Sequence, residues 1–471
     1  MNNVKAENKK SFEMPHGFIV LLIVIVFCAI LTWILPAGSF ERILDSNLGR
    51  EVVVPNSYKA VESNPIGVWS ILKILYKGMV QASDIIFFII FAAAYVFVLI
   101  KTNTLNAMIG AVLKKLGSRD HLLIPIFMLI FGITGATFGM FEETFGLIPA
   151  FIVIGITMGY DRILGSAIVF VGVATGFAAA ILNPFTIGIA SSLAGIPLVS
   201  FKITTFRIVS FILFMSLSIT YVMLYAKKIR KDPTKSIMFG SKENNDIEKN
   251  AMSRDEVMNL PFTINQKISI VIFMVLICFM GYGVAKLGFY LEEISALFIG
   301  ALIITGIVNK MTSKEMCDVF VESTQAVIYG ALFVGLSRAA SIVLTEGHVI
   351  DTAILYMSNA INGLPSVVTS LGMLAVQNVI GFFITSGSGM AVVTMPIMAP
   401  LADLVGMSRE MAVTAYQFGD GFSNLFWPTA VAMQCGIMGI SMDKWYKFIT
   451  PLFLMMILLQ SIMMIVGGFI F

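Results

Sequence analysis

Long apolar runs alternate with short polar stretches along almost the whole chain, and this pattern sets the fold class. A helix needs about 20 apolar residues to cross the hydrocarbon core of a membrane. Runs that predict transmembrane helices cover residues 17–36, 84–100, 163–195, 204–226, 267–285, 291–308, 326–345, 410–438 and 448–471. The pattern therefore predicts an all-α polytopic membrane protein with about nine transmembrane helices. The first run is too long and too uniformly apolar to be a signal peptide, although Lys9 and Lys10 precede it.

Two further apolar stretches, 122–157 and 366–404, are interrupted near their middle by small residues. The first contains Gly132, Gly135 and Gly139, and the second contains the run Ser386-Gly387-Ser388-Gly389. Each half of either stretch is too short or too interrupted to span comfortably. We interpret both as re-entrant helical hairpins, which occur only where protein or a water-filled cavity covers the tip.

The two halves of the chain resemble each other. Gly-Tyr-Asp-Arg at 159–162 matches Gly-Met-Ser-Arg at 406–409, and each half has a mid-helix proline, Pro184 or Pro428. The extra crossing at 267–285 inverts the second half, and inverted repeats with hairpins and broken helices are typical of secondary transporters. The predicted parts are a cytoplasmic N-terminus (1–16), a first repeat (17–226, with hairpin 122–157 and broken helix 163–195), a cytoplasmic linker (227–266), a connecting helix (267–285) and a second repeat (286–471, with hairpin 366–404 and broken helix 410–438). Within the repeats, 67–80 and 313–325 are expected to form amphipathic helices.

Composition agrees with this assignment and excludes other classes. Apolar residues make up 58% of the chain and charged residues 13%, which leaves too few polar side chains to cover a soluble protein. The net charge is +3 without a concentrated basic tract, so we expect no nucleic-acid partner. No P-loop, zinc-ligand pattern or Ser/His/Asp pattern is present, so we expect neither an enzyme nor a resident cofactor or metal.

The distribution of Lys and Arg predicts the orientation, because cytoplasmic loops are enriched in basic residues. One set of loops holds the large majority of the 31 basic residues, among them the groups at 101–119 and 227–231. We therefore expect a bacterial cytoplasmic (inner) membrane protein with its N-terminus in the cytoplasm and its C-terminus outside.

The two broken helices are candidate parts of a binding site. Proline removes a helical hydrogen bond and pushes the preceding residue, Asn183 or Trp427, towards extended geometry. Hydroxyl and amide side chains gather beside these breaks, at Thr186, Ser423, Asn424 and Thr429. An unwound helix in a membrane exposes backbone dipoles that can bind a substrate or cation. The alternative, an ordinary proline kink, is less easily reconciled with two breaks at matching positions.

The hairpin tips carry the remaining candidate chemistry. Ser386, Gly387, Ser388 and Gly389 open a helix with main-chain N–H groups and hydroxyls that suit a carboxylate. The first tip instead has Glu142, Glu143 and Thr144, and Asp420 is a third acid within a span. Ionisable groups at membrane depth are costly and mark functional sites. The alternative reading places these acids in water at a loop, paired with nearby Lys or Arg.

Three acids around one site favour a substrate with a cationic group, or a bound Na⁺ or H⁺, over a simple dianion. Arg338 lies deep in a span, where it could receive a substrate carboxylate or neutralise an acid such as Asp420; both roles stay open. A substrate with one carboxylate and cationic groups would satisfy every element, which describes a basic amino acid.

Four stretches carry a family resemblance: Thr137 to Thr144, Gly176 to Ile189, Phe382 to Gly389 and Gly419 to Asn424. In these motifs the sequence resembles the YfcC-like family, which is related to the DcuC carriers of the ion transporter superfamily. The resemblance implies a homodimer that works as an elevator, with scaffold and transport domains. Members are described as basic amino acid antiporters, some as arginine–ornithine exchangers, while the DcuC branch moves fumarate and succinate.

The sequence thus predicts a secondary transporter of basic amino acids, with arginine exchanged for ornithine as the expected reaction. The alternative is a Na⁺- or H⁺-coupled carrier of C4-dicarboxylates or peptides, in which the acids serve the coupling ion. A channel or a membrane-embedded enzyme has no motif in its favour.

Overall fold

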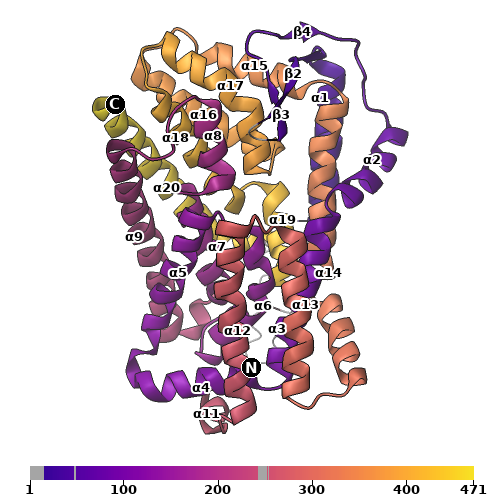
Figure 1. Ribbon diagram of the computed structural model, residues 1–471, viewed down its shortest axis with the longest axis vertical. Coiled ribbons are helices and arrows are strands. Elements are labelled where there is room, and N and C mark those ends of the chain that lie inside the picture. Colours follow the sequence, from indigo (N-terminus) through magenta and orange to yellow (C-terminus); the bar gives the residue numbers. More distant parts are fainter. Residues whose placement is uncertain (1–14, 47–48, 242–251, 253) are drawn as a thin grey trace, which may run out of the picture.

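The computed structural model describes residues 15–46, 49–241, 252 and 254–471, and these residues fold mainly into helices (Figure 1). The first part of the chain forms α1 (Gly17–Ile34), α2 (Val68–Gln81), α3 (Ser83–Lys101), α4 (Thr104–Leu116), η1 (Gly117–Leu122), α5 (Leu123–Phe138), η2 (Glu142–Leu147), α6 (Ile148–Thr157), α7 (Arg162–Ala178), η3 (Pro184–Gly188), α8 (Ile189–Leu193) and α9 (Phe201–Lys231).

The second part begins after a connection, residues 232–263, that contains η4 (Pro233–Lys235) and α11 (Arg254–Asn259). It forms α12 (Ile264–Tyr282), η5 (Gly283–Leu287), α13 (Leu291–Val308), α14 (Ser313–Glu346), α15 (Ile350–Ile361), α16 (Ser366–Phe383), α17 (Gly387–Leu404), α18 (Arg409–Gly421), η6 (Ser423–Leu425), α19 (Pro428–Met438) and α20 (Met442–Ile470).

The expectation of an all-α protein holds for most of the chain, with one difference. Four short strands follow α1: β1 (Gly38–Ser39), β2 (Arg42–Asp45), β3 (Arg50–Val53) and β4 (Lys59–Ala60). They pair as β1 with β4 and β2 with β3, both antiparallel. Strands this short carry no hydropathy pattern, so the apolar runs gave no sign of them.

Ten described helices are long and apolar enough to cross a membrane. Seven of the nine predicted spans each correspond to one uninterrupted helical segment, with 267–285 running from α12 into η5, whereas the spans 163–195 and 410–438 are interrupted, as the prolines predicted. The remaining candidates are arms of the stretches interpreted as hairpins: α5, α16 and α17. The predicted amphipathic helix 67–80 corresponds to α2, whereas 313–325 is the first part of the continuous helix α14.

Both predicted hairpins are pairs of helices with a break at the expected place. Residues 139–141 separate α5 from η2 and α6, and residues 384–386 separate α16 from α17. The expectation that each half is too short to span is wrong for α5, α16 and α17, which are long and apolar enough to cross a membrane. Whether the two stretches re-enter from one side stays a prediction.

Glycines allow the helices around these breaks to pack backbone against backbone. A Cβ on Gly176 of α7 would lie 1.8 Å from the carbonyl oxygen of Gly132 in α5. A Cβ on Gly421, at the end of α18, would lie 2.3 Å from the Cα of Ala178 at the end of α7. The two broken helices therefore cross in direct contact at their interruptions.

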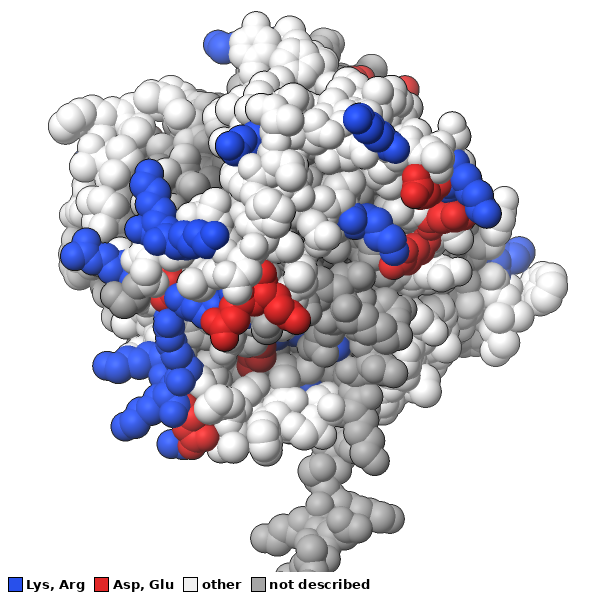
Figure 2. Space-filling model, turned by 90° about the horizontal axis from the view of Figure 1, so that it is seen from below, with Lys and Arg blue, Asp and Glu red and all other residues white. Residues whose placement is uncertain are grey.

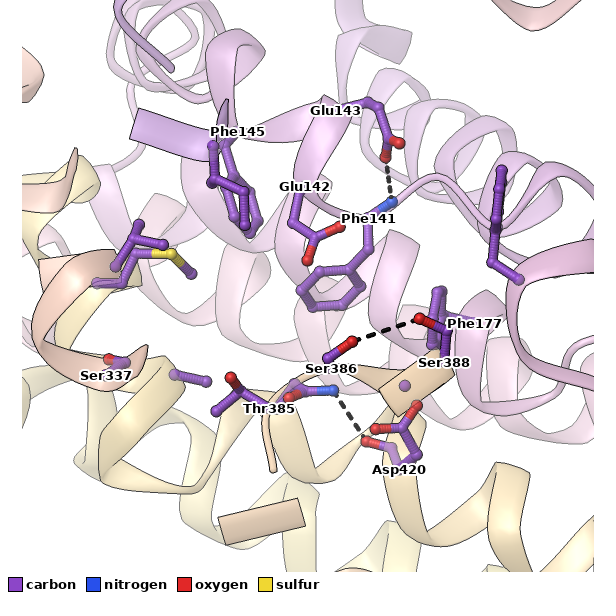
Figure 3. Close-up of a pocket in the computed structure, with 18 of the residues that line it drawn as sticks. Phe141, Glu142, Glu143, Phe145, Phe177, Ser337, Thr385, Ser386, Ser388 and Asp420 are labelled. Carbon is purple, nitrogen blue, oxygen red and sulfur yellow. Dashed lines mark hydrogen bonds between the residues drawn. The ribbon is translucent and has the colours of Figure 1, made fainter. Parts of the chain in front are cut away.

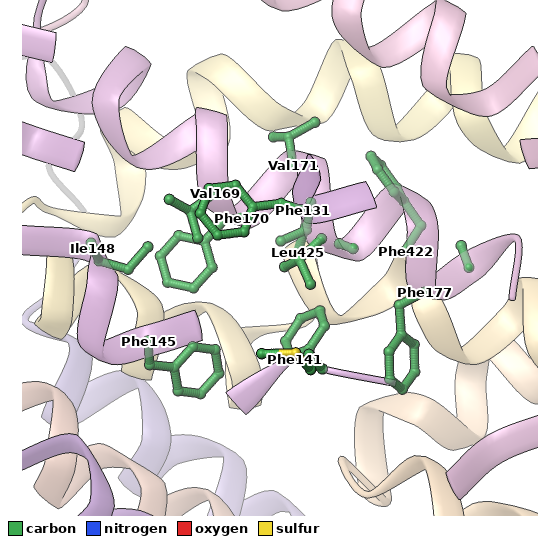
Figure 4. Packing of buried hydrophobic residues seen from close by; sticks show 14 of the residues in the cluster. Phe131, Phe141, Phe145, Ile148, Val169, Phe170, Val171, Phe177, Phe422 and Leu425 are labelled. Carbon is green, nitrogen blue, oxygen red and sulfur yellow. The ribbon is translucent and has the colours of Figure 1, made fainter. Parts of the chain in front are cut away.

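Buried aromatic and aliphatic side chains fill the space behind this crossing (Figure 4). Phe131, Phe170 and Phe177 come from α5 and α7, while Phe422 and Leu425 come from the break of the second half. All five belong to one continuous hydrophobic cluster. The first hairpin and both broken helices thus share a core.

Charged residues gather on the lower end of the molecule, where α4 and α11 lie (Figures 1 and 2). This end carries many Lys and Arg side chains, as expected of a cytoplasmic face. The orientation itself stays a prediction. The predicted cytoplasmic N-terminus (1–16) and linker (227–266) lie partly outside the described residues, which omit 1–14, 242–251 and 253.

Candidate functional site

A cavity of about 1080 Å³, counting the space at its open mouth, lies where the two hairpin tips and the two broken helices meet. Its lining comes from both halves of the chain. It consists of Ile85, Gly139, Phe141, Glu142, Glu143, Phe145, Phe177, Phe185, Thr186, Tyr290, Val334, Ser337, Arg338, Thr385, Ser386, Gly387, Ser388, Asp420, Asn424, Thr429, Ala430 and Met433. Figure 3 shows the first tip facing Thr385, Ser386, Ser388 and Asp420 of the second half.

The first tip is shaped by a helix end and a carboxylate. Gly139 ends α5 with a φ of 71°, in the left-handed region that glycine adopts most readily. The buried Glu143 carboxylate accepts a hydrogen bond from the main-chain N–H of Phe141 at 2.9 Å. Thr144 donates its hydroxyl to the carbonyl of Phe141 at 2.7 Å. Glu143 and Thr144 thus hold the turn that presents Glu142 to the cavity.

The second tip is the start of α17. Ser386 caps this helix, because its hydroxyl accepts a hydrogen bond from the N–H of Gly389 at 3.3 Å. The Ser386 and Ser388 hydroxyls lie 3.4 Å apart (Figure 3). The tip therefore offers hydroxyls and the positive end of a helix dipole to the cavity.

Asp420 has the least compensated charge in the cavity. It is 1% exposed, and neither of its carboxylate oxygens has a hydrogen-bond partner among the described residues. A Cβ on Gly387 would lie 2.6 Å from its Oδ2, so the carboxylate lies directly against the start of α17. A buried, unpaired carboxylate is unfavourable unless a cation or proton joins it.

The charges in the cavity do not balance. Three carboxylates, on Glu142, Glu143 and Asp420, share the lining with the guanidinium of Arg338. Arg338 interacts electrostatically with Glu142, and Glu142 in turn with Asp420. With every group ionised, two negative charges remain without a counter-ion among the described lining residues.

Ten of the fifteen predicted site residues line this cavity: Glu142, Glu143, Thr186, Arg338, Ser386, Gly387, Ser388, Asp420, Asn424 and Thr429. The other five are not among its lining residues: Thr144, Asn183, Gly389, Ser423 and Trp427. Asn183 accepts hydrogen bonds from Phe185 and Thr186 at the start of η3. Trp427 donates its indole N–H to the carbonyl of Asn378 at 2.7 Å.

The sequence reasoning missed an aromatic wall and two hydroxyl residues. Phe141, Phe145, Phe177, Phe185 and Tyr290 line the cavity, together with Thr385 and Ser337. The neighbours of the glutamate pair could have been found, because Phe141 and Phe145 flank it in the sequence. Tyr290 gives no such signal, since it reaches the cavity from the start of α13, more than 100 residues beyond Pro184.

In the described ranges, no three His, Cys, Asp or Glu side chains gather in a way that could hold a metal ion. The lining of the cavity brings carboxylates, hydroxyls and aromatic rings together around one space.

A comparison with known proteins finds relatives that match this chain over nearly their whole length. A protein of Haemophilus influenzae without an assigned function is 28% identical, with 98% of each chain covered. YfcC of Escherichia coli, provisionally named a basic amino acid antiporter, is 27% identical over 97% of this chain and 96% of its own. Among solved structures, Neisseria gonorrhoeae MtrF, whose description places it in a class of antimetabolite efflux pumps, is similar with a TM-score of 0.43 and 16% identity, covering 97% of this chain and 96% of its own.

The family assignment rests on a match that extends over nearly the whole chain. Residues 14–468 match the DcuC family, described as the C4-dicarboxylate anaerobic carrier. This match includes both hairpin-like stretches, both broken helices and every residue of the cavity. The chain therefore belongs to the DcuC family and is a multi-pass membrane transporter.

Proposed function

We propose that the protein is a secondary active transporter of basic amino acids, with arginine exchanged for ornithine as the principal reaction. The observation that carries this proposal is the surplus of carboxylates in the cavity, above all the unpaired Asp420. A dianion would meet net negative charge there, whereas a basic amino acid would supply the missing positive charge. The provisional name of the YfcC relative points the same way.

The arrangement of charges suggests how such a substrate would lie. Asp420 and the start of α17 are adjacent, so they suit the α-ammonium and α-carboxylate of one amino acid. Glu142, on the opposite hairpin tip, would then receive the cationic end of the side chain. Arg338 would accompany Glu142 and orient it, and the aromatic wall would cover the aliphatic part of the substrate.

The origin of the lining supports an elevator mechanism. The hairpin tips and broken helices supply most of the cavity, while Ile85, Tyr290, Val334 and Arg338 come from α3, α13 and α14. In the proposed cycle, the hairpins and broken helices move as one transport domain along a scaffold that includes α3, α13 and α14. A homodimer in the bacterial cytoplasmic membrane, surrounded by lipid, is part of the same proposal, with the N-terminus inside and the C-terminus outside.

The alternative is a Na⁺- or H⁺-coupled carrier of C4-dicarboxylates or peptides. The description of the family as a C4-dicarboxylate carrier favours it. In this case Asp420 and its neighbours would hold the coupling cation, and the hydroxyls at the start of α17 would hold a substrate carboxylate.

Counterflow in proteoliposomes separates the two proposals. Vesicles loaded with unlabelled ornithine receive a trace of labelled arginine, with and without a sodium gradient. Accumulation that needs internal ornithine or arginine and ignores sodium is the expected result. Uptake of labelled succinate driven by sodium or protons, without any arginine signal, would reject the basic amino acid proposal in favour of the alternative.

A further inference from the structure

Two arginines at matching positions make the same contact in opposite directions. Arg162 is the first residue of α7, and its Nη1 donates a hydrogen bond to the carbonyl of Gly439 at 2.9 Å. Arg409 is the first residue of α18, and its Nη1 donates to the carbonyl of Ala194 at 2.7 Å. Each acceptor belongs to the residue that ends the second arm of a broken helix, α19 or α8.

The local geometry around the two arginines also matches. Each arginine follows a capping side chain: Asp161 accepts from the N–H of Leu164, and Ser408 accepts from the N–H of Met411. A glycine with positive φ precedes each arginine by three residues, at 159 (φ 84°) and 406 (φ 67°). The matched tetrapeptides of the two halves thus form the same turn and aim their arginines across to the other half.

The two helices that accept these hydrogen bonds at their ends, α8 and α19, belong to arms that carry lining residues of the cavity. Phe185 and Thr186 stand at the start of the arm that ends at Ala194, and Thr429 and Met433 stand in the arm that ends at Gly439. The last carbonyls of a helix lack partners within it, and a cation stabilises them together with the helix dipole. A guanidinium at this end therefore fixes the position of the whole arm.

We propose that Arg162 and Arg409 are reciprocal positioning residues, each of which fixes the cavity-lining arm contributed by the other half of the chain. Neither arginine lines the cavity, so they act through Thr186 and Thr429 rather than by touching substrate. The site is then complete only when both halves hold each other. This inference extends the proposed transport function but does not depend on which substrate is carried.

Arg162 and Arg409 differ in their surroundings. Arg162 is 1% exposed. The Arg409 side chain is 38% exposed, and it is also held by Asp403, with an Nη2–Oδ2 distance of 2.6 Å. The two acceptors differ in the opposite sense, because Ala194 is buried whereas Gly439 is half-buried.

Thiol labelling without substrate tests the reciprocity directly. Cys435 is a buried native reporter on α19, and Ser191→Cys supplies a buried reporter on α8. The exposed Cys278 and Cys317 are first replaced by Ser, and labelling by N-ethylmaleimide is assigned to each site by peptide mass. Arg162→Met is expected to speed labelling at Cys435 about tenfold, and Arg409→Met at the position-191 thiol, each without effect on the other reporter.

The control is Arg119→Met, which changes an exposed arginine and is expected to leave both rates unaltered. Arg162→Lys and Arg409→Lys retain a donor and are expected to show smaller changes, which keeps the test decisive if a Met variant does not fold. Unchanged rates, or equal increases at both reporters with either variant, would overturn the proposal.

A transport readout complements the labelling. With whichever substrate the wild-type protein exchanges, arginine or succinate, the Lys variants are expected to raise KM about fivefold or more while the maximal exchange rate changes less. A fall in maximal rate with unchanged KM would contradict positioning of the site. Failure of arginine exchange in the wild type would reject the proposed substrate, but it would not affect the labelling test of Arg162 and Arg409.

Discussion

The two helix breaks have similar sequence signals but differ in how their backbone is satisfied. In the first break, Asn183 accepts hydrogen bonds from the N–H groups of Phe185 and Thr186. In the described parts of the chain, no donor reaches the main-chain oxygens of residues 179–182. The first break therefore has a capped helix start but a row of bare carbonyls before it.

The second break is closed by side chains from later helices. Gln434 donates to the carbonyl of Asn424 at 2.8 Å, Trp445 to Leu425 at 3.0 Å and Tyr446 to Phe426 at 2.8 Å. The main-chain oxygen of Asp420 is also used, by the Ser423 hydroxyl at 2.8 Å and the Asn424 amide at 3.0 Å. What stays unsatisfied at this break is the Asp420 carboxylate itself.

This difference indicates that the two helix breaks have different roles. The second break positions the Asp420 carboxylate for a ligand, because side chains of the protein already donate to the carbonyls of residues 424–426. The first break is held through its N–H groups, since Ile181 and Leu182 donate to the carbonyl of Ala136 at 2.8 and 3.0 Å, and its own carbonyls are left for a ligand. The following predictions test this contrast, from the largest expected effect to the smallest.

Asp420→Asn is expected to reduce exchange most, because it removes the unpaired charge for which the second break is built. A hydrogen bond to a charged group contributes about 1.5–3 kcal/mol, so affinity should fall roughly 10- to 100-fold. Counterflow at a series of substrate concentrations measures the change. Asp443→Asn, at an acid paired with Lys447 on α20, is the matched control and should leave exchange unaltered. Normal affinity in Asp420→Asn would remove the carboxylate from the site.

Glu142→Gln is expected to weaken arginine exchange strongly, though less than Asp420→Asn, while expression stays normal, because the first tip then lacks the charged ligand for the cationic end of the substrate. Glu143→Gln tests a different role, since that carboxylate holds the N–H of Phe141. It should weaken exchange and lower the thermal stability of the tip as well. Near-normal uptake by Glu142→Gln would refute its assignment.

Gln434→Leu is expected to destabilise the protein by about 1–3 kcal/mol, because it leaves the buried carbonyl of Asn424 without its donor. Asn183→Ala, at the first break, removes a helix cap and should cost about 0.5–2 kcal/mol. Thermal unfolding in detergent compares the two. A larger loss at Asn183 would contradict the view that the second break depends on side-chain donors to its carbonyls.

Ser386→Ala should have the smallest effect, about threefold in KM, because the hydroxyl is one of several donors at the start of α17 and its bond to Gly389 is long at 3.3 Å. Initial rates of counterflow measure it. A complete loss of exchange would mean that the second tip depends on this single hydroxyl.

Much of this architecture could be predicted from the sequence, since breaks in helices are local events. Pro184, Pro428, Gly139 and the small residues after Thr385 act on their own neighbours, so all four interruptions were predictable. The acids were found for a similar reason, because a carboxylate within an apolar run is unusual wherever it lies.

The remaining features depend on contacts between distant segments. Gln434, Trp445 and Tyr446 are unremarkable in sequence, and only the fold places them on the carbonyls of residues 424–426. Tyr290 reaches the cavity from another helix in the same way. Hydropathy also gave no sign of β1 to β4, because strands of two to four residues have no apolar period to detect.

The central claim is that the cavity selects its substrate by positive charge, and citrulline tests it most directly. Citrulline has nearly the shape of arginine but an uncharged end. In ornithine-loaded proteoliposomes, labelled arginine should accumulate at least ~10-fold better than labelled citrulline, as expected when one charge-assisted hydrogen bond is lost. Equal accumulation of the two, or exchange of succinate in place of both, would contradict the account.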